Sequence, residues 1–326
     1  MNRTGFKDLN ESEILDSVRR ALEGLEFSTF GLGVCAKDAL LKLKIRESAI
    51  SYISSSYNAI YESDNHNLYA LIDLDRGIVE ARPSSVYIEG RYNKYSRKIA
   101  QTFHYCFRCK GRGCSNCNFT GKLSELSVQE ILEQKLLAPF GSGHSKFHGA
   151  GREDVDVLML GAGRPFIFEA LDPKKRSADL KALEDEINSA FNGLVGVHSL
   201  SFAKKERIEQ LKSTPFEKVY SALCSCGEKI SPQELNAIAG KAFDVAQMTP
   251  ERVSKRRVEK ERSKSAKVLS VQLLNDAEFR LEILASHGLY VKEFISGDGE
   301  RTKPSVSSLL GKKCACKELD VIEVRA

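Results

Sequence analysis

The chain contains 326 residues, of which 42% are hydrophobic, and it carries a formal net charge of +5. This length is typical of two domains with sizeable cores. No run of about 18 apolar residues occurs, so we expect no membrane-spanning helix and no membrane partner. The polar start, MNRTGFKDLNESEI, has no apolar stretch typical of a signal peptide. We therefore expect a cytoplasmic protein, or a nuclear one in a eukaryote, whose mild positive charge permits nucleic-acid binding without requiring it.

The N-terminal part has the pattern of a mixed α+β unit. Residues 12–24 place apolar side chains at helical spacing, and KDALLKLKIRESAISYI predicts a second helix. Two strand-like stretches, separated by a turn, follow between Leu68 and Ile88. We predict a smaller N-terminal domain that comprises residues 1–125.

A cysteine cluster lies near the end of this part. HYCFRCKGRGCSNCNFTGK has the spacing C-x2-C-x4-C-x2-C, which supplies four soft ligands for a tetrahedral zinc ion and leaves no open position for catalysis. The odd number of cysteines, nine, and the tight clusters that eight of them form favour a metal in a reducing compartment over a disulfide framework. The alternative is four unligated thiols. The predicted ligands of a structural zinc ion are Cys106, Cys109, Cys114 and Cys117.

The surroundings of the cluster leave two questions open. Four cations among the cysteines serve either RNA contact or solubility: Arg108, Lys110, Arg112 and Lys122. Two C-x-C pairs would share a second metal only if the fold brought them together: Cys224 with Cys226, and Cys314 with Cys316.

The rest of the chain is predicted to form a larger α+β domain, residues 126–326. A helix is expected to begin at Ser127, because Glu130 completes a capping box. A Gly/His-rich loop then leads to a predicted hairpin that turns at residues 161–163. The remaining pattern predicts a helix at 177–192 and strands at 194–203, 217–223, 268–275, 288–295 and 318–325, with 278–285 open between strand and helix. These elements favour a mixed, largely antiparallel sheet.

Several polar segments of this domain are candidates for chemistry. GREDVDV, residues 151–157, brings a carboxylate to the start of an apolar strand, although such a cluster is usually a surface ion pair. KVYSA at 218–222 and GLYVKEF at 288–294 place a tyrosine and a lysine in apolar stretches, where a buried core residue and a solvated face are the ordinary roles. The basic run at 252–267 is typical of either a solvated face or a phosphate-contacting segment.

These segments, in their order along the chain, resemble a known family. The succession R-x-D, K-x-Y-x-A and G-x-Y-x-K is similar to the motif order of pseudouridine synthases. FHGAGREDVDVLMLGAGRPFIFEA, FEKVYSAL, QMTPERVSKRR and GLYVKEFISGDGERTKPSVSSLLG more closely resemble the tRNA pseudouridine-54/55 synthases of archaea and eukaryotes. The resemblance extends from about residue 100 to the C-terminus, and the residues before it match only by position.

The resemblance implies both a fold and an activity. The implied fold is an α+β pseudouridine-synthase catalytic domain, preceded by a THUMP-like RNA-binding region with a cysteine zinc site. The implied reaction isomerises uridine to pseudouridine in the T-loop of tRNA, at position 54, 55 or both. It needs no redox or organic cofactor, its partner is the T-arm of tRNA, and we expect the enzyme to be a monomer.

Catalytic residues carry over by their place in the motifs. Asp154 is expected to be the nucleophile, Tyr220 the aromatic that stacks on the target base, and Lys292 the cation that pairs with Asp154. The sequence leaves open whether Asp154 attacks C1′ of the ribose or removes its C2′ proton. Asp156 is the obvious competitor, because a strand would place it on the same face as Asp154. Asp154 is preferred because it stands two residues after Arg152, as in the R-x-D motif.

The other site predictions concern packing and RNA contact. A hydrophobic residue near Leu309 is expected to pack against the site, and Leu310 would serve as well. For Arg164 and Arg301 the alternative to phosphate contact is a role in holding loops. The side chains predicted to contact RNA, besides Tyr220 and Leu309, are Arg152, Arg164, Arg256, Arg257 and Arg301.

Other functions compete with this prediction. One is a catalytically silent, zinc-containing tRNA-binding or chaperone protein, which the intact Asp154, Tyr220 and Lys292 disfavour. A tRNA methyltransferase or sulfur transferase would need a glycine-rich strand–helix turn for its cofactor, and the sequence lacks one. A zinc deaminase would need H-x-E or C-x-E followed by P-C-x-x-C, whereas the C-x-E at Cys226 has no C-x-x-C after it.

Overall fold

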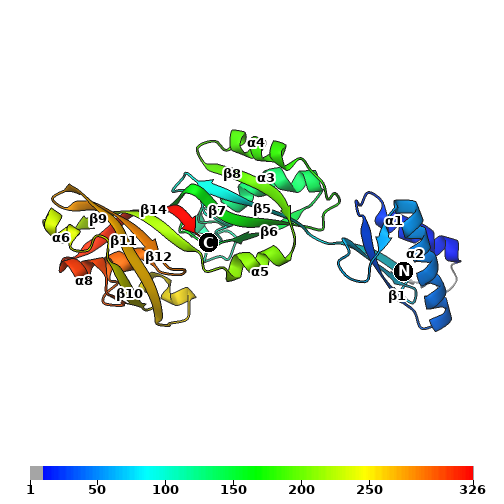
Figure 1. Cartoon of the computed structure of the whole chain (residues 1–326). Coiled ribbons are helices and arrows are strands. Elements are labelled where there is room, and N and C mark those ends of the chain that lie inside the picture. Colours follow the sequence, from blue (N-terminus) through cyan, green and yellow to red (C-terminus); the bar gives the residue numbers. More distant parts are fainter. Residues whose placement is uncertain (1–9, 326) are drawn as a thin grey trace. The chain divides into compact units, whose positions relative to one another are not determined.

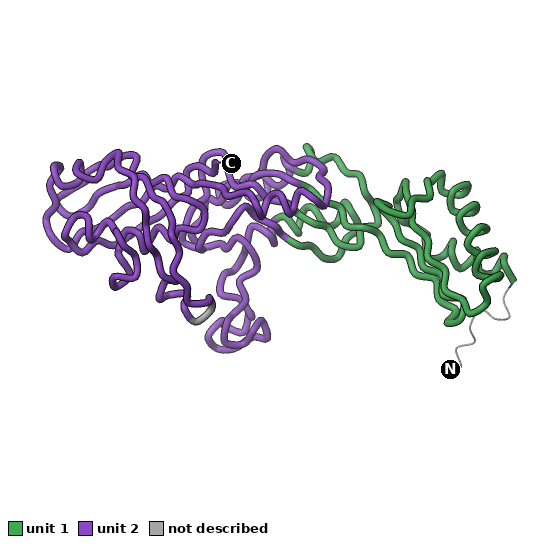
Figure 2. Tube along the Cα trace, turned by 60° about the horizontal axis from the view of Figure 1, so that its bottom comes forward, with its two compact units in different colours: residues 1–88, 132–146, 168–183 green, residues 89–131, 147–167, 184–326 purple. Residues whose placement is uncertain are grey.

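The computed structural model describes residues 10–325, apart from the side chains of residues 255 and 256. The chain forms two compact units that interleave along the sequence (Figure 2). The first unit takes in the chain up to residue 88 together with 132–146 and 168–183, and the second comprises 89–131, 147–167 and 184–326. The cysteine cluster therefore lies in the second unit, whereas the sequence pattern groups it with the N-terminal domain.

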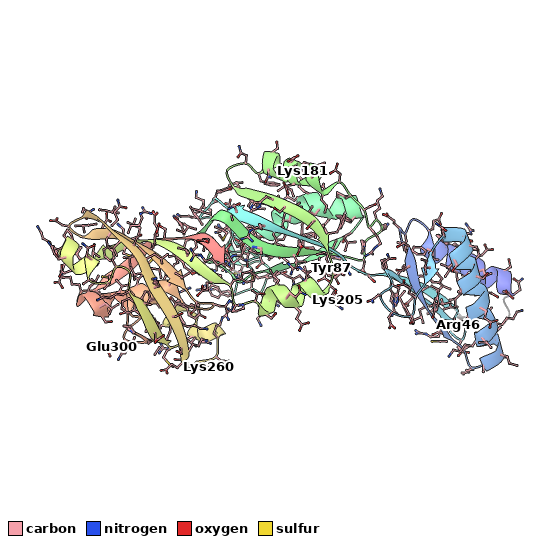
Figure 3. All side chains as sticks on the ribbon, viewed as in Figure 1. Arg46, Tyr87, Lys181, Lys205, Lys260 and Glu300 are labelled. Carbon is pink, nitrogen blue, oxygen red and sulfur yellow. The ribbon has the colours of Figure 1, made fainter. Side chains whose placement is uncertain are left out.

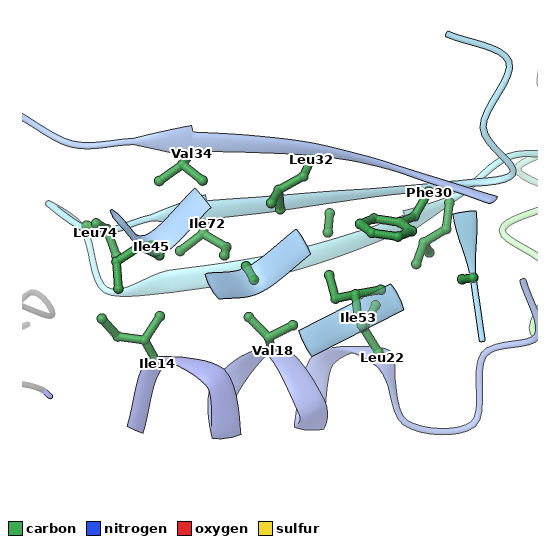
Figure 4. Close-up of a cluster of buried hydrophobic side chains, with 14 residues drawn as sticks. Ile14, Val18, Leu22, Phe30, Leu32, Val34, Ile45, Ile53, Ile72 and Leu74 are labelled. Atoms are coloured by element: carbon green, nitrogen blue, oxygen red, sulfur yellow. The ribbon is translucent and has the colours of Figure 1, made fainter. Parts of the chain in front are cut away.

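The first unit contains a small sheet and two helices that share one core. The strand order is β2-β1-β3-β4, with β1 parallel to β2 and β3, and β4 antiparallel to β3. α1 begins at Asn10, whose capping box is completed by Glu13, and it buries Ile14, Val18 and Leu22 against the sheet (Figure 4). The elements are α1 (Glu11–Leu22), β1 (Thr29–Cys35), α2 (Ala39–Tyr57), β2 (Ile60–Tyr61), β3 (Leu68–Asp73) and β4 (Ile78–Pro83).

One side chain of α2 joins that helix to the sheet. Arg46 (Figure 3) donates to the Leu32 carbonyl at 2.9 Å and to the Tyr61 hydroxyl. The two helices and the strands expected in this region are confirmed. Among the described helices of the whole chain, none is long and apolar enough to cross a membrane.

The second unit contains most of a ten-stranded sheet (Figure 1). The order is β13-β10-β11-β12-β9-β14-β7-β5-β8, and β6 also pairs with β7. The pairings from β13 to β14 are antiparallel, and β14 runs parallel to β7. The strands are β5 (Val86–Lys94), β6 (His144–Gly149), β7 (Leu158–Leu171), β8 (Val195–Ala203), β9 (Glu217–Cys226), β10 (Ala242–Gln247), β11 (Arg262–Asn275), β12 (Glu278–Ala285), β13 (Thr302–Lys303) and β14 (Cys314–Arg325). The predicted mixed, largely antiparallel α+β fold is confirmed.

Short helices fill the connections between these strands. The helices after β5 are α3 (Val128–Phe140), α4 (Leu180–Ala190), α5 (Glu206–Ser213), α6 (Pro232–Asn236), α7 (Val291–Ser296) and α8 (Val306–Leu310). Two 3-10 helices also occur among the described residues: η2 (Ser115–Cys117) lies in the cysteine cluster, and η3 (Glu251–Arg256) follows β10. These last elements matter for function, because η3 and α7 bring charged side chains to the same place.

Three predictions of local structure are wrong. The Gly/His-rich stretch, residues 141–151, expected to be a loop, contains strand β6, which pairs with β7. Gly161 and Gly163 do not turn a hairpin but lie inside the continuous strand β7, with φ of 58° and 69°. A Cβ on Gly161 would lie 2.0 Å from the carbonyl oxygen of Ile322, so glycine lets β7 pass close to β14. The stretch 288–295, expected to be a strand, is a turn that leads into α7, and the ambiguous stretch 278–285 is strand β12.

Candidate active site and metal centre

A cleft of about 710 Å³ in the second unit collects most of the predicted site residues. Its walls come from the loop before β7, from β9, from η3, from α7 and from β14. The predicted side chains that line it are Arg152, Asp154, Tyr220, Arg257 and Lys292. Segments that are far apart in the sequence therefore meet at one place, as a shared catalytic site requires.

A buried ion pair holds the loop that presents Asp154. Arg164 Nε lies 2.9 Å from Glu153 Oε2, and both side chains are only 1% exposed. Arg164 also donates to the Ala150 carbonyl at 2.7 Å, and the Tyr92 hydroxyl donates to Glu153 at 2.8 Å. Of the two roles expected for Arg164, these contacts support the holding of a loop, and its side chain is not among those that line the cleft. The buried Glu153 carboxylate needs a cation, so Arg164 lies in the core and holds the loop.

A buried lysine secures the same loop. Lys94 Nζ donates to the carbonyls of Val155 at 2.6 Å, Ile99 at 3.1 Å, Ser96 at 3.3 Å and Asp154 at 3.4 Å. Burial lowers the pKa of Lys94 to about 8, while the four carbonyl oxygens satisfy its ammonium form. The backbone is thus fixed, whereas the Asp154 side chain remains 45% exposed and lines the cleft.

Two cations contact the Asp154 carboxylate. Arg252 Nη1 lies 3.1 Å from Asp154 Oδ2, and Lys292 Nζ lies 3.5 Å from the same oxygen. Lys292 is closer to Asp156, at 2.8 Å from Oδ2 and 2.9 Å from Oδ1. The expected pairing of Lys292 with Asp154 is present but shared, and Arg252 is the nearer partner.

Arg252 is oriented by α7. Glu293, whose side chain is 6% exposed, accepts a hydrogen bond from Arg252 Nε at 2.6 Å. The guanidinium also lies 6.0 Å from the ring centroid of Tyr290. Although burial acts in the opposite direction, the bond to Glu293 raises the pKa of Arg252. Sequence reasoning missed this arginine, since QMTPERVSKRR offers several cations and only the fold brings one of them against α7.

Tyr220 lines the cleft, as expected of a residue that stacks on the target base. It lies on β9 between Ile283 of β12 and Val321 of β14, is partly buried, and lines the cleft. Burial raises the pKa of its hydroxyl, so the phenol is neutral near neutral pH. A neutral aromatic ring in a cleft offers a face on which a nucleobase stacks.

The apolar partner of the site differs from the expected one. Leu309 lies on α8 and is not among the residues that line the cleft, whereas Leu319 on β14 is. The motif order could not reveal this, because it carries no information on the register of β14. Leu309 is therefore replaced by Leu319 as the apolar residue of the candidate site.

Three other arginines predicted to contact RNA differ in their surroundings. Arg152 is exposed at the cleft and makes no ion pair with any residue that the structure describes. Arg301 donates to the Thr249 carbonyl at 2.7 Å and pairs with Glu259, so it holds the chain around η3. The side chain of Arg256 lies outside the described part of the structure.

The four predicted zinc ligands are arranged as a metal site. Their sulfur atoms all lie within 4.8 Å of one another, and three of the separations are 3.8 Å. A tetrahedral zinc ion with bonds of about 2.3 Å requires sulfur separations of about 3.8 Å. The N–H groups of Gly113 and Cys114 donate to the sulfurs of Cys109 and Cys117, at 3.2 Å and 3.3 Å, as thiolate ligands require. The thiols therefore fit a four-coordinate metal ion.

The two C-x-C pairs do come together on adjacent strands. In the register of β9 and β14, Cys226 faces Cys314 and Cys224 faces Cys316. Within residues 10–325, however, the first cluster is the one place where three or more such ligand atoms gather closely enough for a metal. The structure therefore does not support a second metal site.

Comparison with known proteins places this cleft in a family. A family model described as "Pus10, C-terminal" matches residues 87–325. The protein named tRNA pseudouridine synthase Pus10 from Korarchaeum cryptofilum is 38% identical over 323 residues, which cover 93% of this chain and 87% of that protein. The chain belongs to the Pus10 family.

Other Pus10 proteins show the same relation. The Archaeoglobus fulgidus protein of this name is 36% identical over 335 residues, which cover 96% of this chain and 91% of the relative. The Methanocaldococcus jannaschii protein is 44% identical over 241 residues, 73% of this chain but only 53% of the longer relative. Membership of the Pus10 family makes the chain a pseudouridine synthase, which is an isomerase. The predicted family and enzyme class are therefore confirmed.

The similarity to solved structures is weaker than the similarity to these Pus10 sequences. A chain in "Crystal Structure of a Cbf5-Nop10-Gar1 Complex" has a TM-score of 0.31 and 15% identity, over 72% of this chain and 58% of that chain.

Proposed function

We propose that this protein isomerises uridine to pseudouridine in the T-loop of tRNA, at position 54, 55 or both, with Asp154 as the nucleophile. The observation that carries the proposal is the Asp154 carboxylate, which is exposed in a cleft beside Arg252, Lys292 and Tyr220. The name shared by the Pus10 relatives supports tRNA as the substrate.

The reaction exchanges one bond of the ribose for another. The C1′–N1 bond breaks, the uracil turns, and a C1′–C5 bond forms, while C5 loses a proton and N1 gains one. Nothing is oxidised or reduced, so no redox cofactor enters the balance. The ribose gains positive character as uracil leaves, and a carboxylate stabilises that charge, as in glycoside cleavage. Asp154 is held for this task by Arg252 and Lys292, which orient its carboxylate.

The target base must leave its stack to reach the carboxylate. Flipping a nucleotide costs a few kcal/mol, and stacking on an aromatic ring returns about 1–3 kcal/mol. Tyr220 supplies that ring, Leu319 supplies an apolar contact, and Arg152 is available for a phosphate next to the flipped nucleotide.

The cysteine cluster and the N-terminal region complete the proposal. A zinc ion held by four thiolates has no open position, so it would stabilise the loop and take no part in the chemistry. We further propose that residues 1–125 bind RNA through a THUMP-like fold and that the enzyme acts as a monomer in the cytoplasm.

The test uses an unmodified tRNA transcript and maps pseudouridine by carbodiimide-dependent stops in primer extension. The wild-type protein is expected to create a stop in the T-loop. Transcripts with cytidine at position 54 or at position 55 show which uridine is the substrate, because the corresponding stop disappears. Tight tRNA binding without any T-loop stop would instead identify a catalytically silent tRNA-binding protein.

A further inference from the structure

The loop that carries the four cysteines, residues 103–123, is here called the knuckle, and its surface is rich in aromatic side chains. Tyr105 is 60% exposed, Phe107 is 57% exposed and Phe119 is 77% exposed. Single exposed apolar residues are common, whereas three exposed aromatic rings on one small loop make that loop a candidate surface for a partner.

Phe119 is held in a backbone conformation that phenylalanine rarely adopts. Its φ is 62°, and the preceding Asn118 has a φ of 48°. The turn itself imposes this geometry, because the Phe119 N–H donates to the carbonyl of the predicted ligand Cys114 at 2.9 Å. Glycine or asparagine would fit this turn with less strain. The knuckle thus presents a large ring to solvent at a place where the fold alone favours a smaller residue.

The knuckle has a net positive charge. It contains four cations and no aspartate or glutamate, and a zinc ion with four thiolates has a formal charge of −2, so 4 − 2 leaves +2. Lys122 is paired with Glu130, whereas Arg108, Lys110 and Arg112 are exposed. This net positive charge favours a polyanion as the binding partner of the knuckle over a protein surface with few acidic residues.

The knuckle is continuous with the catalytic cleft. Phe103 and His104, at its base, line the cleft together with Arg152 and Asp154. The ring of Phe103 packs against that of Tyr105, with centroids 4.2 Å apart. The base of the knuckle therefore forms part of the wall of the cleft that would receive the uridine.

We infer that the knuckle is a second RNA-binding surface, on which Phe119 and Tyr105 stack against unpaired nucleobases while Arg108 and Lys110 contact phosphates of the same RNA. This inference rests on the proposed function, since that RNA is the tRNA whose uridine lies at Asp154. Aromatic faces interleaved with cations are the usual means by which proteins bind unpaired nucleotides.

The decisive variant is Phe119→Asn. Asparagine tolerates the left-handed turn, so the variant removes the ring without straining the knuckle, and its zinc content and thermal midpoint should match the wild type. The Kd for an unmodified tRNA transcript, measured by fluorescence anisotropy, is expected to rise about 5- to 100-fold. KM should rise with it while kcat stays unchanged, and Phe119→Tyr should restore both. The matched control is Leu274→Ala, which trims a 44% exposed apolar residue outside the knuckle and should leave Kd unchanged.

The phosphate interactions have a separate readout. Each phosphate interaction that an Arg108→Ala, Lys110→Ala double variant removes should reduce the slope of log Kd against log salt by about 0.7 to 0.9. An unchanged slope, or a Phe119→Asn protein that binds and converts tRNA like the wild type, overturns the inference. A wild type that binds tRNA without isomerising it overturns the proposed function and leaves the binding comparison valid. A wild type that does not bind tRNA overturns both.

Discussion

At the scale of single residues, the structure distinguishes two aspartates that are equivalent by sequence pattern. Asp154 and Asp156 stand two residues apart, and Lys292 contacts both of them. Asp154 lines the cleft and has a second cation, Arg252, at 3.1 Å. Asp156 is not among the described residues that line the cleft, and its carboxylate lies 2.8 Å from Lys292 Nζ.

Arg252 is expected to act in the chemical step. Arg252→Gln removes the cation nearest Asp154 while keeping a polar side chain of similar reach. Because a preorganised charge is lost, kcat should fall about 10- to 100-fold in single-turnover assays with saturating enzyme. Glu293→Gln should lower kcat in the same direction and by less, since it weakens only the bond that orients Arg252.

Arg257 provides the matched control for this prediction. It lines the same cleft and follows η3, but the structure gives it no contact with Asp154. Arg257→Gln should therefore raise KM for tRNA and leave kcat nearly unchanged. The role assigned to Arg252 is refuted if Arg252→Gln changes KM alone, as the control does.

At the scale of elements, β9 carries a buried lysine two residues before Tyr220. Lys218 is 6% exposed and donates to the Phe216 carbonyl at 2.7 Å. Burial, followed by the repulsion from Arg164, lowers the pKa of Lys218 to about 8. In the unfolded chain a lysine has a pKa of about 10.4, so between these values the unfolded state binds more protons than the folded state. The contribution of Lys218 to stability therefore becomes more favourable as pH rises from about 8 to 10.5.

Lys218→Met tests this pH dependence. The difference in thermal midpoint between wild type and variant should shift in favour of the wild type when the pH is raised from 7.5 to 10. Comparing the two proteins cancels the titration of the other lysines and tyrosines. A difference that stays constant across this range would show that Lys218 keeps its ordinary pKa in the fold.

Local sequence patterns predicted most elements and the order of the motifs, but they failed where tertiary contacts decide. Gly161 and Gly163 look like a turn in sequence, yet close contact with neighbouring strands makes them part of β7. Lys292 looks like the solvated face of a strand in sequence, whereas it lies on α7. Leu319 and Arg252 could not be found at all, because only strand register and packing bring them to the cleft.

At the scale of the whole molecule, the family match begins at residue 87, at the start of β5. The knuckle and the catalytic cleft lie within this matched region and within the second compact unit. The pattern of the chain changes near residue 125, and this change predicts a boundary there. The compact units instead interleave, and a pattern read along the chain cannot show that later segments return to an earlier unit.

The proposed reaction depends on one carboxylate, Asp154. The decisive comparison is between Asp154→Asn and Asp156→Asn on an unmodified tRNA transcript, with pseudouridine mapped by carbodiimide-dependent primer-extension stops and tRNA affinity measured in parallel. Asp154→Asn should bind tRNA and give no T-loop stop, whereas Asp156→Asn should still give the stop. A stop with Asp154→Asn and none with Asp156→Asn would contradict the proposed mechanism and move the chemistry to the other carboxylate.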